Sequence, residues 1–124
     1  MNSLPLPSRS TATPEQTQNF NALSDLTRLR MDPQTPVEAA LCDQIVIALW
    51  HMRIHRSLAG RLDRQIRKVE KSEPNSPGIK QLRSDLAAAL WQTRRQKNFA
   101  WRRRGEYWAL RLARHEENRT QFSS

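Results

Sequence analysis

Residues 35–71 read TPVEAALCDQIVIALWHMRIHRSLAGRLDRQIRKVEK, and this stretch decides the fold. Thr35 can cap a helix, and Glu38 can reach back to the cap. Pro36 suits the first helical position, because an N–H there would have no hydrogen-bond partner within the helix. Interface positions then recur at alternating steps of four and three residues, a period that is typical of a helix packed along a second helix. These positions are Val37, Leu41, Ile45, Ala48, Met52, His55, Ala59, Leu62, Ile66 and Val69. The stretch therefore predicts one helix over about residues 36–71, about 50 Å long.

A second apolar stripe covers only the first part of this helix. It consists of Ile47, Trp50, Ile54 and Leu58. This part of the helix therefore needs two packing partners, whereas the remainder needs one. The remaining face carries cations at helical spacing over about 27 Å. These cations are Arg53, Arg56, Arg64, Arg67 and Lys71.

Breaks on both sides of the central helix define the other elements. Residues 72–77 read SEPNSP and predict a loop, after which a second long helix is expected over about 78–118. Two long helices joined by a short loop fold back antiparallel. The residues TPEQ at 13–16 resemble a capping box and predict a short helix over about 14–31. The Ser/Thr/Pro-rich residues 1–13 are expected to form a disordered tail. The predicted fold class is all-α, a long antiparallel helical hairpin with a short N-terminal helix.

The second long helix is expected to turn its largest side chains inward. The expected interior residues are Ile79, Leu82, Leu86, Ala89, Leu90, Trp101, Tyr107, Trp108 and Leu112. For a turn centred near residue 75, Trp50 lies level with about residue 100 and Trp108 lies level with about residue 42. Trp50, Trp101 and Trp108 are therefore predicted in the core, whereas Trp91 faces elsewhere and is the candidate for an exposed ring.

A two-helix hairpin has a thin core, so the second stripe needs a cover. The cover is the segment around residues 20–29, a second copy of the chain, or another protein. Of these we expect self-association.

Composition points to a polyanionic partner. The 124 residues leave room for one domain, expected over residues 14–124, and 21 Lys and Arg against 12 Asp and Glu give a net charge of +9. The stretch from Leu86 to His115 holds eight Lys and Arg, five aromatic residues and one carboxylate. Guanidinium groups neutralise phosphates, and flat rings either pack in a core or stack on bases. Such a domain favours nucleic acid first, then an anionic membrane surface or an acidic protein, and the alternative is a merely solvated surface.

The leading hypothesis is a non-enzymatic nucleic-acid-binding module, with double-stranded or folded RNA as the first candidate and duplex DNA as the second. Cations along a rigid helix contact successive phosphates and give affinity without reading sequence. The candidate binding residues are Arg53, Arg56, Arg64, Arg67, Lys71, Arg94, Arg95, Lys97, Arg102, Arg103, Arg104, Arg111 and Arg114. The rival hypothesis is a structural hairpin that docks a protein partner through its Trp-lined second stripe.

Signals for catalysis or metal binding are weak. His51 and His55 have the spacing that lets two imidazoles share a metal, but a zinc-protease motif needs Glu where this chain has Met52. We therefore expect no enzymatic activity, no metal and no cofactor. The single Cys42 excludes an internal disulfide and fits a reducing compartment. No apolar run approaches the ~18 residues of a membrane span, so we expect a cytoplasmic protein without a membrane partner.

Two stretches resemble a family of small bacterial helical proteins. Its members carry a block similar to T-P-x-E-x-x-L followed by a helix with A-x-W-R-x-R-R, and the second stretch, RRGEYWALRLARHE at residues 103–116, is similar to the family's second helix. The residues that match the first block are Thr35, Pro36, Glu38, Leu41, Ala48 and Trp50. The similarity covers about residues 20–118, and the N-A-x-x-H-G-L segment with which members usually begin is absent. The resemblance implies a helical fold and a bacterial or mobile-element setting. A place in a larger ribonucleoprotein or element-encoded assembly belongs to the nucleic-acid-binding hypothesis, which the charge of +9 motivates. The family has no established activity, so the resemblance assigns no functional residue.

Overall fold

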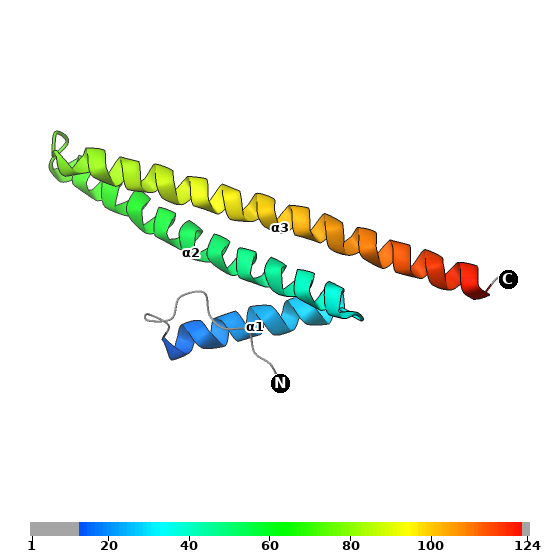
Figure 1. Cartoon of the computed structure of the whole chain (residues 1–124). Coiled ribbons are helices and arrows are strands. Elements are labelled where there is room, and N and C mark those ends of the chain that lie inside the picture. The colour runs from blue at the N-terminus through cyan, green and yellow to red at the C-terminus, as the bar shows by residue number, and fades with distance from the viewer. Residues whose placement is uncertain (1–12, 123–124) are drawn as a thin grey trace.

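The computed structural model describes residues 13–122, which form three α-helices. They are α1 (Pro14–Met31), α2 (Pro36–Ser72) and α3 (Gly78–Phe122). The helices α2 and α3 form an antiparallel hairpin, α1 lies beside the first half of α2, and the end of α3 extends beyond the hairpin (Figure 1). The all-α fold is as predicted. The predicted tail lies outside the described residues except for Thr13, which caps α1.

Both N-terminal caps form as the sequence predicts, with one change of partner. The Thr13 hydroxyl accepts a hydrogen bond from the Gln16 N–H at 3.1 Å, and the Gln16 side chain accepts one from the Thr13 N–H at 3.0 Å. The Thr35 hydroxyl accepts from the Glu38 N–H at 3.1 Å. The Glu38 carboxylate does not return to Thr35, because it accepts from the Gln34 N–H at 3.0 Å. Glu38 thereby joins α2 to the turn before it.

The α2 side of the hairpin interface follows the predicted spacing. Residues at the expected positions are buried or half-buried: Leu41, Ile45, Ala48, Met52, His55, Ala59, Leu62, Ile66 and Val69. Val37 is the exception, with 59% of its surface exposed. The interface position at this end of α2 belongs to Glu38, which is only 2% exposed.

In the second half of α3, the interface is shifted by one residue from the predicted Trp101 and Trp108. Trp101 and Trp108 are exposed, whereas the residues before them, Ala100 and Tyr107, are buried. One residue turns a helix by about 100°, so this shift moves both indoles out of the core. The expected interior residues Leu90 and Leu112 are exposed as well. Those that do lie in the interface are Ile79, Leu82, Leu86, Ala89 and Tyr107.

The helix α1 covers part of the second stripe of α2. Phe20 and Leu23 pack against Val46 and Trp50, and the Phe20 and Trp50 rings meet edge to face with centroids 5.4 Å apart. Trp50 therefore lies in the core, as predicted. Its burial depends on α1 rather than on α3.

The rest of the second stripe is only partly covered within the described chain, and Ile47 is half-buried. Ile54 and Leu58 remain 38% and 37% exposed, respectively. The expectation of self-association stays a prediction.

Polar side chains of α3 hold the corner between α1 and α2. The Tyr107 hydroxyl and the Arg111 guanidinium both donate to the carbonyl oxygen of Met31, the last residue of α1. The last carbonyls of a helix have no helical partner and carry partial negative charge, so these donors satisfy and stabilise the end of α1. Tyr107 also packs in a buried apolar cluster with Met31, Leu41, Cys42 and Ile45.

A buried ion pair completes this corner. Arg114 donates to the Glu38 carboxylate through Nε at 2.8 Å and Nη2 at 3.2 Å. Burial alone raises the pKa of Glu38. The hydrogen bond from Gln34 and the charges of Arg114 and Arg111 outweigh burial, so the pKa lies below the usual 4.5.

Replacing Glu38 should expose the pH dependence of this corner. A carboxylate with a lowered pKa stabilises the fold fully above pH 4.5, and the contribution is lost as pH falls through the folded pKa. We expect Glu38→Gln to lower the free energy of unfolding at pH 7 by about 2–4 kcal/mol and to flatten its decline in acid, measured by urea unfolding with circular dichroism.

The control is Glu70→Gln. Glu70 Oε1 pairs with Arg83 Nη2 at 2.6 Å, and both side chains are substantially exposed. Such a surface pair contributes about 1 kcal/mol or less. Equal losses in the two variants would contradict the role of the buried pair.

The adjacent residues Tyr107 and Trp108 test the rotation of α3. Tyr107→Ala removes a fully buried ring and should lower the free energy of unfolding by about 3–5 kcal/mol. Trp108→Ala removes a ring that is 41% exposed and should cost about 1 kcal/mol. Thermal or urea unfolding measures both, and the reverse order of losses would place Trp108 in the core instead.

Candidate nucleic-acid interface

Three of the thirteen candidate cations are half-buried and engaged within the fold, and a fourth, the exposed Arg67, forms an ion pair with Asp63 at 3.2 Å. Arg111 and Arg114 hold the corner described above. Arg103 donates to Glu106 at 2.7 Å and lies over the Phe99 ring at 4.9 Å from its centroid. All three side chains are half-buried, so their guanidinium groups already serve contacts inside the chain.

The other ten candidate cations are exposed, and six of them divide between two grooves. Arg94, Arg95 and Arg102 line the first groove, and a second groove is lined by Arg56, Lys97 and Arg104. Positions 95 and 97, like 102 and 104, are about 200° apart around a helix. The two grooves therefore flank the α2–α3 interface on opposite sides. The four remaining exposed cations are Arg53, Arg64, Arg67 and Lys71, all on α2.

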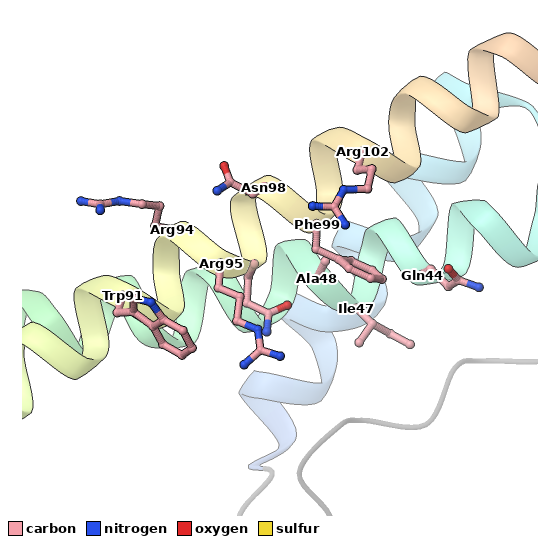
Figure 2. A pocket seen from close by; sticks show the side chains of 10 residues that line it. Gln44, Ile47, Ala48, Trp91, Arg94, Arg95, Asn98, Phe99 and Arg102 are labelled. Carbon is pink, nitrogen blue, oxygen red and sulfur yellow. The ribbon is translucent and has the colours of Figure 1, made fainter.

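The first groove is an open hollow of about 760 Å³ between α2 and α3. Its lining residues are Gln44, Ile47 and Ala48 of α2 and Trp91, Arg94, Arg95, Gln96, Asn98, Phe99 and Arg102 of α3. Figure 2 shows the Phe99 ring directed toward α2 near Ile47, with Trp91 at one end of the groove and Gln44 at the other. Arg94 and Asn98 lie on its outer rim (Figure 2).

Trp91 and Arg95 are in contact with each other in the first groove. The guanidinium carbon of Arg95 lies 5.3 Å from the centroid of the Trp91 ring, a cation–π contact. The Trp91 side chain is nevertheless 55% exposed, as the sequence predicts. Arg94 and Arg102 form no hydrogen bond or ion pair with any described residue, and no carboxylate is among the described lining residues. The groove therefore combines an open ring with unneutralised cations.

The second groove repeats this chemistry on a smaller scale. It encloses about 150 Å³ and is lined by Ile45, Leu49, Met52, Arg56, Lys97, Ala100, Trp101 and Arg104. The guanidinium carbon of Arg104 lies 5.4 Å from the centroid of the Trp101 ring. The described lining again contains no carboxylate.

The cations could be identified from the sequence, but the groove that they line together with other side chains was not predicted. Phe99, Ile47 and three amides were not candidate site residues, although the amides Gln44, Gln96 and Asn98 all line the first groove. A signal was present, because Trp91, Arg95, Asn98 and Arg102 recur at steps of four, three and four residues and so share one helix face.

Other chemistry at the surface is limited. The His51 and His55 rings meet at 6.5 Å between centroids. Burial and the neighbouring His55 lower the pKa of His51. Within residues 13–122, no group of three or more His, Cys, Asp or Glu could hold a metal ion. In the same residues no helix has the length and apolar character needed to cross a membrane.

Comparison with known proteins gives no match: no family model, no curated protein and no solved structure is similar to this chain. Function must therefore be inferred from the residues and their geometry.

Proposed function

We propose that this chain is a non-enzymatic nucleic-acid-binding module, with RNA as the first target class and DNA as the second. The observation that carries the proposal is the pair of grooves beside the α2–α3 interface. Each is lined by three cations and an exposed tryptophan, and neither described lining includes a carboxylate.

The distribution of charge supports a polyanionic ligand. Elsewhere several cations have carboxylate partners, as in Arg28–Asp43 at 2.6 Å and Arg83–Glu70 at 2.6 Å. Among the described residues, the six groove cations have no such partner, so their charge remains available where a ligand has access. Phosphates bound there would release counterions, which favours binding at low salt.

The spacing of these cations suits a phosphate backbone. Arg95 and Arg102 lie two turns apart on one side of α3, and Lys97 and Arg104 repeat that spacing on the other side. Each pair spans about 10 Å along the helix axis. Contacts of this kind position a nucleic acid without specifying its sequence.

The ten exposed cations carry the proposal, and Arg103, Arg111 and Arg114 belong to the structural core of the hairpin. We place the module in the cytoplasm, as a subunit of a larger ribonucleoprotein or mobile-element assembly. The cationic helix faces are the observation behind the proposed assembly.

A second candidate function is a structural hairpin that docks a protein partner. The sequence placed the docking surface on the second stripe of α2, but Trp50 of that stripe is buried against α1. Exposed side chains of α3 favour this function instead, because Trp101, Trp108 and Leu112 are 61%, 41% and 66% exposed. Self-association through these α3 side chains would appear as a mass that rises with concentration in analytical ultracentrifugation. The groove cations have no part in that function.

Neutralising cations in both grooves should weaken nucleic-acid binding. The variant Arg95→Gln, Lys97→Gln, Arg102→Gln and Arg104→Gln removes four proposed phosphate contacts. We expect the affinity for a labelled RNA stem-loop to fall about 100-fold in fluorescence anisotropy, and the slope of log K against log salt to become shallower by about 3–4.

The matched control removes the same charge elsewhere, through Arg30→Gln, Arg61→Gln, Lys68→Gln and Lys80→Gln. These four residues are exposed and line neither groove. We expect this variant to lose less than about fivefold in affinity, as a change in overall charge alone predicts. Equal losses would show that net charge, not the grooves, governs binding.

A further inference from the structure

We propose that the first groove binds unpaired nucleotides, with one base stacked on Trp91 and the adjoining phosphates held by Arg95 and Arg102. This inference rests on the proposed function and names its ligand class, single-stranded segments of RNA or DNA.

The exposure of Trp91 is the first support. A tryptophan with 55% of its surface in water leaves a large flat ring accessible, and Arg95 against it at 5.3 Å helps to hold its orientation. A base can therefore stack on the accessible part of an indole that is already positioned. Such stacking contributes about 5- to 150-fold to affinity per base and tolerates any sequence.

The lining of the groove supplies the other contacts that a nucleotide requires. Its volume of about 760 Å³ lies within the range of pockets that hold small organic ligands. Gln44, Gln96 and Asn98 offer amide donors and acceptors for base edges or sugar hydroxyls. Phe99 and Ile47 form an apolar wall between the helices (Figure 2). The second groove, at about 150 Å³, has no amide among its described lining residues.

Base pairing decides which nucleic acids can use Trp91. In a duplex each base is stacked between its neighbours, so its faces are closed to a side chain, whereas unpaired bases can be splayed out onto aromatic rings. A duplex can contact the guanidinium groups around the groove through its phosphates, but its bases cannot stack on Trp91. Trp91 should therefore add affinity for single strands and none for duplexes.

The test compares a 12-nucleotide single-stranded RNA with the corresponding 12-base-pair duplex, using fluorescence anisotropy of the full chain. We expect Trp91→Ala to weaken the single strand about tenfold and the duplex less than twofold, and Trp91→Phe to restore the single strand to within about threefold of the parent. Alanine is favourable in helices, so α3 should persist, which circular dichroism checks. The control Trp108→Ala removes a ring that lines neither groove and should leave both affinities unchanged.

The remaining outcomes separate this inference from the proposed function. If the four-cation variant loses RNA binding but Trp91→Ala binds both RNAs as the parent does, the stacking site is wrong and nucleic-acid binding stands. If Trp91→Ala weakens the affinity for the single strand and the duplex equally, the stacking site is also wrong, because the ring then maintains the shape of the groove and does not stack on a base. If the parent chain binds neither RNA, both proposals fail and an acidic protein helix becomes the ligand to test in this groove.

Discussion

The rotation of α3 about its own axis is the constraint on which the rest of the structure depends. Tyr107 and Arg111 reach the last carbonyl of α1, and Arg114 reaches the buried carboxylate of Glu38. These contacts lie on a single face of α3, which must therefore point at the corner between α1 and α2. An unsatisfied buried carboxylate is costly, so a different rotation of α3 would be strongly unfavourable. The polar end of the interface fixes α3 more specifically than alanines and leucines alone could do.

This rotation determines what the surface offers to a ligand. With Ala100 and Tyr107 facing inward, Trp91 lines the first groove and Trp101 lines the second, each with an arginine against its ring. The remaining groove cations of α3 are also exposed, and none of them has a carboxylate partner within residues 13–122. Arginines of one helix thus divide into two roles, since those at the corner stabilise the fold and those in the grooves remain available for binding. The groove cations of α3 lie between Arg94 and Arg104, and the residues that hold the corner follow them at 107, 111 and 114.

The helix boundaries could be predicted from the sequence because they depend on local chemistry. Thr13 and Thr35 are followed by proline at the next position, and α1 and α2 begin at Pro14 and Pro36. The rotation of α3 could not be predicted, because its interface includes Arg103, Arg111 and Arg114, which look like surface residues in a hydrophobic pattern. The inward turn of Tyr107 depends on the Met31 carbonyl, which is 76 positions away in the chain. Likewise the exposed cations were recognisable, but the groove that combines them with Trp91 and three amides depends on how α2 passes beside α3.

The salt dependence of binding by the unmodified chain tests the central claim most directly. Fluorescence anisotropy with a labelled RNA stem-loop, repeated across salt concentrations, gives the affinity and its logarithmic slope. Ten exposed cations predict measurable binding at about 150 mM salt and a steep slope, with several phosphates neutralised. Absence of binding at that salt, or an affinity that does not change with salt, would contradict a function based on these cations.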